Sequence, residues 1–323
     1  MPNKVPMVSI IIAAHNRPEY LIEALESLKR QTAAIEDFEV IVVKDYELDL
    51  SKINSSMMAI TFIDTSDNEL VSKHIAGIKA SKGDFIALMD DDDLFSPIKI
   101  ERILSLSQYM GKRSLYINAK QFFTNSLDTL SILSNTSITS FEMFEPAQFH
   151  SRRLIQHDPW YNLSSMTIGR DLALEGSEII RDFKREIDPL WYIIALERAD
   201  KIVYDRSRLT LYRRHLGGVS RSGNKNKTCI YAKQAIESYD KMENIFRNKV
   251  ALDTVIAMRA EWYIKATSLG CKFRECNFLN TFLSLLKSLR YHSIKDVSKL
   301  LLLLLLSRVN VRISSNIYPK LYL

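Results

Sequence analysis

Apolar, β-branched runs alternate with amphipathic segments over the first hundred residues. The segment 8–14 is apolar apart from Ser9 and shows no polar alternation, which is typical of a strand buried on both faces of a parallel sheet. Shorter runs of the same kind follow it. Strands are therefore predicted over residues 8–14, 38–43, 60–63 and 84–89.

Helical periodicity fills the gaps between these strands. Leu21, Leu25 and Leu28 recur on one face of the segment after the first strand, as in an amphipathic helix. We expect Asn16 to cap this helix, because Glu19 completes an N-x-x-E capping box. Further helices are predicted over residues 71–80 and from Pro97 onward.

Alternating strands and helices imply right-handed crossovers and a doubly wound, mostly parallel α/β sheet. Ligands of such sheets bind at the carboxyl ends of the strands. No glycine occurs before Gly77, so the glycine-rich turn of a nicotinamide-binding fold is missing and a dehydrogenase is excluded. The polar residues that follow the four strands are His15, Asn16, Lys44, Asp45, Asp64, Thr65 and Asp90 to Asp93.

The rest of the chain has a less regular pattern. A strand is predicted over residues 161–169, a helix from Asp188 to Arg198, and a short strand over residues 201–204. Beyond residue 227 the pattern is helical to the end. The sequence thus predicts two domains, an α/β domain over residues 1–226 and a helical C-terminal region over residues 227–323.

A block of negative charge, Asp90 to Asp93, follows the fourth predicted strand. Helix capping explains one or two acidic residues there, but not four in a row. An EF-hand loop is excluded, because Phe95 and Pro97 stand where that loop needs a glycine turn and free backbone. Adjacent carboxylates suit a hard divalent cation, which also binds diphosphate oxygens. The first hypothesis is therefore metal-assisted chemistry on a phosphorylated substrate.

The composition is that of a packed globular protein. The chain has 323 residues, of which 46% are apolar and 25% charged. Cys229, Cys271 and Cys276 lack metal-ligand spacing, so we expect reduced thiols in a cytosolic protein. Residues 1–7 lack the apolar core of a signal peptide, so export is not expected.

The net charge of +6 resides in the C-terminal tail, where residues 287–323 hold seven Lys and Arg against one Asp. A basic, leucine-rich tail on a balanced body is more typical of a membrane-surface contact than of nucleic-acid binding. The run Leu300–Leu306 is too short to span a bilayer, which needs about 20 residues. It is either a buried helix or a helix lying in the membrane interface. In the second case anionic lipid would contact Lys287, Arg290, Lys295, Lys299 and Arg308.

Four segments resemble glycosyltransferase family two, a group of inverting, nucleotide-sugar-dependent enzymes with the GT-A fold. They are residues 8–32, 38–45, 83–93 and 211–220, which resemble the opening strand and helix, the second strand, the D-x-D region and the closing loop. The resemblance extends over about residues 7 to 221, roughly two thirds of the chain. The sequence departs from the family where Ala13-Ala14-His15 replaces Pro-Thr-Tyr, and where Lys44-Asp45-Tyr46-Glu47 replaces Asp-Asp-Gly-Ser.

The resemblance implies roles for the residues at the strand ends. Asp92 and Asp90 would bind Mn²⁺ or Mg²⁺ as the D-x-D pair, Asp91 would lie near the ribose, and Asp45 would bind the nucleotide base. His15 would contact the donor or hydrogen-bond a loop. Lys73 would approach the base or diphosphate, unless it faces water like most helix lysines.

The closing loop offers three more candidates. His215 would be a metal ligand delivered by a loop with two glycines, or else an ordinary loop histidine. Arg213 and Arg214 would hold phosphate oxygens, although one of two neighbouring arginines often faces solvent.

The inverting mechanism requires a carboxylate that removes a proton from the acceptor hydroxyl. The segment Glu186-Ile187-Asp188-Pro189 leaves two candidates, Asp188 and Glu186, and Asp188 is alternatively only an N-cap. Trp191 belongs either to the core or to an acceptor platform.

The sequence thus predicts an inverting, metal-dependent glycosyltransferase that uses a nucleoside-diphosphate sugar, with UDP as the expected nucleotide. We expect a saccharide or lipid-linked saccharide acceptor, a role in bacterial surface polysaccharide synthesis, and a place in the cytoplasm or on the inner face of the membrane. One alternative is a catalytically inactive nucleotide-sugar-binding or scaffold protein. Another is a sugar-1-phosphate nucleotidyltransferase, although the glycine-rich loop of that class is absent.

Overall fold

The computed structural model describes residues 5–49, 53, 58–124, 137–146, 162–214, 225–271, 281–283, 298–302 and 304–305. The chain divides into two compact units, of which the first comprises residues 1–146, 161–183 and 198–215. The second comprises residues 147–160, 184–197 and 216–323. The predicted boundary after residue 226 falls within the second unit and stays a prediction.

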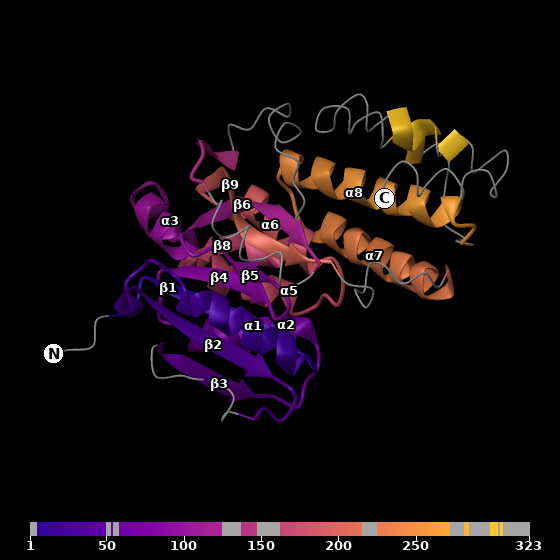
Figure 1. Cartoon of the computed structure of the whole chain (residues 1–323). Coiled ribbons are helices and arrows are strands. Elements are labelled where there is room, and N and C mark those ends of the chain that lie inside the picture. The colour runs from indigo at the N-terminus through magenta and orange to yellow at the C-terminus, as the bar shows by residue number, and fades with distance from the viewer. Residues whose placement is uncertain are drawn as a thin grey trace. The chain divides into compact units, whose positions relative to one another are not determined.

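A nine-stranded sheet forms the centre of the first unit, with the order β3-β2-β1-β4-β8-β6-β9-β5 and with β7 paired to β9 (Figure 1). The pairs β1/β2, β1/β4, β2/β3 and β6/β9 are parallel, and the other pairs are antiparallel. The strands are β1 (Val8–Ala14), β2 (Phe38–Lys44), β3 (Ile60–Asp64), β4 (Phe85–Asp90), β5 (Leu94–Phe95), β6 (Ser114–Phe123), β7 (Phe141–Phe144), β8 (Met166–Gly169) and β9 (Lys201–Arg213).

Helices cover both faces of the parallel half of the sheet. Ile10 and Ile12 of β1 share one apolar cluster with Leu21 and Leu25 of α1. Ile11 points to the opposite face, because side chains alternate along a strand, and there it lies against Gly77 of α2. The α-helices of this unit are α1 (Pro18–Lys29), α2 (Leu70–Ala80), α3 (Lys99–Leu106) and α5 (Arg170–Ile180). Short 3₁₀ helices occupy Ile35–Asp37, Ser107–Tyr109 and Leu163–Ser165. The predicted doubly wound α/β fold is thus confirmed.

Three local predictions are wrong. The strand expected over residues 161–169 is shorter, because β8 spans only Met166–Gly169 and a 3₁₀ helix occupies Leu163–Ser165. Asn16 does not cap α1, since the cap position is Arg17 and no side chain makes a capping hydrogen bond. Asn16 instead has a φ of 53°, in the left-handed region, so the chain turns there before the helix begins. The strand expected over residues 201–204 is β9, which runs for 13 residues because β5, β6 and β7 all pair with it.

Gly169, the last residue of β8, packs directly on backbone. A Cβ atom there would lie 2.5 Å from the carbonyl oxygen of Lys112. Gly169→Ala is therefore expected to lower the free energy of unfolding by about 1 to 3 kcal/mol, as overpacking does. Urea denaturation measures this loss. Gly111→Ala is the matched control, because no described atom lies within 4 Å of its added Cβ. Equal stabilities for the two variants would contradict the prediction.

The second unit is helical in its described part. Its main helices are α6 (Ile187–Arg198), α7 (Lys225–Ile245) and α8 (Lys249–Ser268). Figure 1 shows α7 and α8 side by side, in agreement with their many mutual contacts. Asn248 caps α8, since its side chain accepts a hydrogen bond of 2.8 Å from the backbone N–H of Val250. Trp191 of α6 is 1% exposed, which makes it a core residue rather than an acceptor platform.

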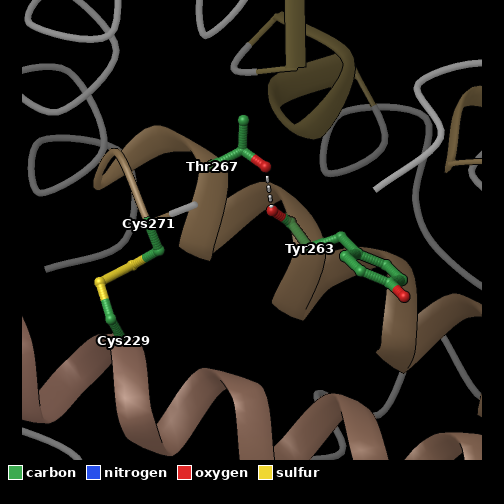
Figure 2. The surroundings of a disulfide bond; sticks show 4 residues. All are labelled: Cys229, Tyr263, Thr267 and Cys271. Carbon is green, nitrogen blue, oxygen red and sulfur yellow. Dashed lines mark hydrogen bonds between the residues drawn. A yellow bond between two sulfur atoms is a disulfide. The ribbon is translucent and has the colours of Figure 1, made fainter. Parts of the chain in front are cut away.

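A disulfide joins α7 to the end of α8. Cys229 and Cys271 are bonded with their Cα atoms 5.6 Å apart, and Figure 2 shows the bond beside the last turn of α8. In that turn the Thr267 hydroxyl donates a hydrogen bond to the carbonyl of Tyr263. The expectation of reduced thiols is therefore wrong for this pair, because two antiparallel helices bring together cysteines that are 42 residues apart. Cys276 lies outside the described residues.

Loss of this disulfide is expected to destabilise the helical unit. A bridge across 42 residues restricts the unfolded chain, so Cys229→Ser should lower the free energy of unfolding by about 2 to 4 kcal/mol. Urea denaturation with and without a thiol reductant measures the loss. The reductant should destabilise the wild-type protein to the same extent and leave the variant unchanged; a wild-type protein insensitive to reductant would refute the prediction.

The leucine run is partly packed. Leu300 and Leu304 are 4% and 2% exposed, whereas Leu302 and Leu305 are 48% and 51% exposed. Within the described part of the chain, no helix has the length and hydrophobicity needed to cross a membrane. Lys299 is half-buried, and the other four basic residues expected to contact lipid lie outside the described residues.

Candidate functional site

The parallel half of the sheet brings several polar residues to one edge. The register pairs Ala14 with Lys44 and Ala13 with Asp90, so β1, β2 and β4 end at the same level. The residues just beyond these ends are His15, Asp45 and the aspartate run. The convergence predicted from the strand pattern is therefore present.

Asp45 is the centre of a first cluster. Its Oδ2 atom lies 2.5 Å from Nδ1 of His15 and 3.0 Å from Nζ of Lys73. Lys73 reaches this position from α2, is 1% exposed, and also donates a hydrogen bond of 2.8 Å to the carbonyl of Ala14. Lys73 thus points into the site rather than toward water.

The environment of Asp45 favours its charged form. Burial raises the pKa of Asp45, but the hydrogen bonds from Lys73 and His15 outweigh it, so the pKa lies below its usual value. Its other oxygen, Oδ1, is buried and has no hydrogen-bond partner among the described residues. This oxygen is a ready acceptor for an N–H group of a ligand.

Asp91 faces the start of α1. It is fully buried, and its oxygens lie 2.8 Å from the backbone N of His15 and 2.5 Å from Nη2 of Arg17. Burial raises the pKa of Asp91 to about 6, although the neighbouring Arg17 charge opposes the shift. Its position apart from the other three carboxylates agrees with a role different from theirs.

The other three aspartates form a possible cation site. Asp90, Asp92 and Asp93 each offer a carboxylate oxygen, and these atoms lie within 4.8 Å of one another. Oxygen ligands at this spacing fit a hard divalent ion such as Mg²⁺ or Mn²⁺. Asp90 and Asp92 were predicted as metal ligands from the sequence, whereas Asp93 was not.

Asp93 also has a structural role. It is 1% exposed, and it accepts hydrogen bonds of 2.9 Å from the backbone N of Arg213 and 3.2 Å from Nδ2 of Asn162. Burial, together with the charge of Asp92, raises its pKa to about 6. Asp93 therefore ties the aspartate run to the end of β9.

Arg17 is the residue that sequence reasoning missed. Its guanidinium makes ion pairs with both Asp91 and Asp92. Burial lowers the pKa of Arg17, but the charges of Asp91 and Asp92 outweigh it and keep the pKa above its usual value. The available signal was a basic residue two positions after His15, at the same strand end as the acidic run. Arg17 supplies a fixed positive charge beside the possible metal ligands.

Arg213 and Arg214 have different environments. The Arg213 side chain is 4% exposed, and its guanidinium lies 2.6 Å from Glu23 and 2.8 Å from the carbonyl of Asp92. Arg213 therefore holds the backbone of the aspartate run. Arg214 is exposed and stacks on Phe122, with Cζ 3.6 Å from the ring centre. The phosphate-binding role expected for these two arginines stays a prediction.

The remaining predicted residues lie elsewhere. His215 is outside the described residues, so its predicted metal role is untested. Glu186 and Asp188 belong to the second compact unit. Asp188 lies in the first turn of α6, and Glu186 is the residue just before that helix.

The residues of this site lie in a segment that matches a known protein family. Residues 9–160 match the family model described as Glycosyl transferase family 2. The matched segment, slightly less than half of the chain, is thus similar to glycosyl transferase family 2. This match contains β1 to β4 and all four aspartates, so the resemblance seen in the sequence is confirmed.

Curated relatives agree with the family. An uncharacterized glycosyltransferase of Haemophilus influenzae is 36% identical over 173 residues, which are 52% of this chain and 55% of the relative. The uncharacterized glycosyltransferase EpsJ of Bacillus subtilis is 30% identical over 168 residues, 49% of this chain and 46% of EpsJ. The succinoglycan biosynthesis protein ExoO of Rhizobium meliloti is 27% identical, covering 45% of this chain and 40% of ExoO. The chain thus spans about half the length of the curated relatives it matches.

Solved structures with the same fold cover almost the whole chain. S. aureus TarS 1–349 has a TM-score of 0.56 and 16% identity, covering 97% of this chain and 91% of that one. The same protein in complex with UDP-GlcNAc has a TM-score of 0.54 and 15% identity, with the same coverage. The mannosyltransferase PcManGT of Pyrobaculum calidifontis, in complex with GDP-Man and Mn²⁺, has a TM-score of 0.56 and 11% identity, covering 96% of this chain and 83% of that one. The family 2 segment thus lies in a chain with the GT-A fold.

Proposed function

We propose that this protein is an inverting glycosyltransferase that transfers a sugar from a UDP-sugar to a hydroxyl of a saccharide or lipid-linked saccharide. The observation that carries the proposal is the clustering of Asp45, Asp91 and the three possible metal ligands at the ends of three parallel strands of a family 2 segment. Structural neighbours with this fold bind UDP-GlcNAc, or GDP-Man with Mn²⁺. The name of ExoO supports a setting in surface polysaccharide synthesis.

The donor would lie along the strand ends. Asp45 would accept a hydrogen bond from the nucleotide base through its unpartnered Oδ1, and Asp91 would lie near the ribose. Asp90, Asp92 and Asp93 would hold Mn²⁺ or Mg²⁺, which when bound neutralises charge on the diphosphate. Arg17 adds a positive charge next to the same carboxylates.

The transfer step joins the acceptor oxygen to the anomeric carbon while the bond from that carbon to the diphosphate breaks. The hydroxyl proton passes to the carboxylate of Asp188 or Glu186, and the diphosphate leaves with the electron pair. We expect oxocarbenium character in the transition state, as in other glycosyl chemistry.

A donor panel tests the proposal. Purified protein is mixed with UDP-glucose, UDP-GlcNAc or GDP-mannose, with Mn²⁺ or with EDTA, and release of the nucleoside diphosphate is measured. Metal-dependent UDP release from one UDP-sugar would support the proposal. Donor binding without release would favour an inactive binding protein, and turnover only with a nucleoside triphosphate and a sugar phosphate would favour a nucleotidyltransferase.

The expected place of action is the inner face of the cytoplasmic membrane. The basic tail would bind anionic lipid, and the exposed Leu302 and Leu305 offer apolar contacts beside Lys299. Flotation with vesicles containing phosphatidylglycerol, compared with neutral vesicles, tests this placement. Equal recovery of the protein with both kinds of vesicle would overturn the electrostatic contact.

A further inference from the structure

Glu186 has an unusual backbone conformation at the start of α6. Its φ is 62°, in the left-handed region that residues other than glycine seldom adopt. Its carbonyl oxygen accepts a hydrogen bond of 2.9 Å from the backbone N of Leu190, which closes the first turn of the helix. The conformation of Glu186 therefore sets where α6 begins, and Asp188 lies two residues further on in that first turn.

The Glu186 side chain holds this conformation through three hydrogen bonds. Its Oε2 atom accepts from the hydroxyl of Tyr239 at 2.6 Å and from Nε1 of Trp262 at 3.0 Å. Its Oε1 atom accepts from the hydroxyl of Tyr231 at 3.1 Å. We call these three donors, Tyr231, Tyr239 and Trp262, the Glu186 cage. Two of them come from α7 and one from α8, so both long helices are tied to the start of α6.

The cage donors keep their protons. Burial raises the pKa of Tyr239 well above its usual value, and the nearby Glu186 charge raises it further. The same two causes raise the pKa of Tyr231, with a further contribution from Asp188. Both phenols therefore remain hydrogen-bond donors to the carboxylate over the physiological pH range.

Cations and rings pack around the cage. The Tyr231 and Trp262 ring centroids are 5.2 Å apart. The Arg185 guanidinium lies 5.4 Å from the Tyr231 ring centre, and Nζ of Lys265 lies 4.4 Å from the Trp262 ring centre. Two cations therefore lie against the rings of the Glu186 cage.

We propose that Glu186 is a positioning residue whose cage orients the start of α6, and not the carboxylate that takes the acceptor proton. This assignment rests on the proposed function. A general base must be able to approach the acceptor hydroxyl, whereas both Glu186 oxygens are already engaged by donors from two helices. Through the cage, the packing of α7 and α8 fixes the backbone that carries Asp188.

The test compares two substitutions at one position. In Glu186→Gln the amide oxygen can still accept from Tyr239 and Trp262, and the amide N–H₂ can donate to the Tyr231 oxygen. Glu186→Gln should therefore lower kcat by much less than the about 10²- to 10⁴-fold decrease that follows removal of a general base. Glu186→Ala removes every contact of the cage, so kcat should fall while the KM for the donor stays near the wild-type value.

Substitutions in the cage give a second measurement if Glu186→Ala does not fold. Trp262→Phe and Tyr231→Phe each remove one donor and keep a ring, so each should lower kcat and the melting temperature with little change in donor KM. Glu237→Gln serves as the control, because it makes the same chemical change on the exposed face of α7, where that side chain is 58% exposed.

The outcomes separate this inference from the proposed function. A Glu186→Gln protein with a wild-type melting temperature and a kcat lowered at least about 10²-fold would identify Glu186 as the base and overturn the inference. Wild-type kcat in Trp262→Phe and Tyr231→Phe would overturn it as well. If wild-type protein transfers no sugar from any donor, the proposed function fails, and with it the role of Glu186 in positioning a catalytic segment. The melting temperatures would then still show whether the cage holds Glu186.

Discussion

Asp188→Asn is expected to lower kcat by about 10²- to 10⁴-fold, as loss of a general base does, while donor binding stays intact. Asparagine caps a helix about as well as aspartate, so the start of α6 should be preserved. Asparagine cannot take up the proton of the acceptor hydroxyl. The measurement is kcat for sugar transfer together with the donor dissociation constant.

Asp171→Asn is the matched control for this substitution. Asp171 lies in the first turn of α5 and is exposed, so it undergoes the same change of charge at a helix start. It should leave kcat unchanged. An active Asp188→Asn protein would place the base elsewhere.

Asp92→Asn is expected to abolish most metal-dependent turnover, with a loss in kcat/KM of about 10²- to 10³-fold, equivalent to about 3 to 4 kcal/mol. The lost carboxylate is one of three whose oxygens lie within 4.8 Å of one another. Asparagine retains an oxygen that can accept from Arg17, so the local fold should persist. Calorimetric titration with Mn²⁺, which does not depend on enzyme activity, should show that the variant binds the metal more weakly.

Asp84→Asn is the control for the metal prediction. Asp84 lies just before β4, at the opposite end of the strand that delivers the aspartate run, and forms an ion pair of 2.9 Å with Lys112. This variant should bind Mn²⁺ as the wild-type protein does. If Asp92→Asn keeps near-normal turnover throughout a Mn²⁺ titration, the carboxylate cluster is not the metal site.

Several contacts could not be predicted from the sequence because they join residues that lie far apart along the chain. The packing of Arg213 between the rings of Tyr20 and Phe123, and its contact with Glu23, link β9 to α1 across 190 residues. The local pattern showed only two neighbouring arginines. A guanidinium inside the protein and one on its surface give the same sequence signal.

The cysteines illustrate the same limit. Spacing alone suggested reduced thiols, but the pairing of α7 with α8 places Cys229 and Cys271 at bonding distance. A disulfide requires a particular separation and orientation of two backbones, which spacing along the chain does not encode.

The α/β fold of the first unit was predictable from the sequence alone, as was the convergence of Asp45 and Asp90 to Asp92 at the strand ends. These features follow from hydrophobic periodicity and from polar residues placed directly after apolar runs, which are local properties. Other contacts are apparent only in the folded chain: Lys73 points at Asp45, Arg17 pairs with Asp91 and Asp92, and Asp93 joins the carboxylate cluster. The same is true of Glu186, which accepts hydrogen bonds from three donors on two helices. Side-chain partners depend on the packing of distant segments, and that packing exists only in the folded chain.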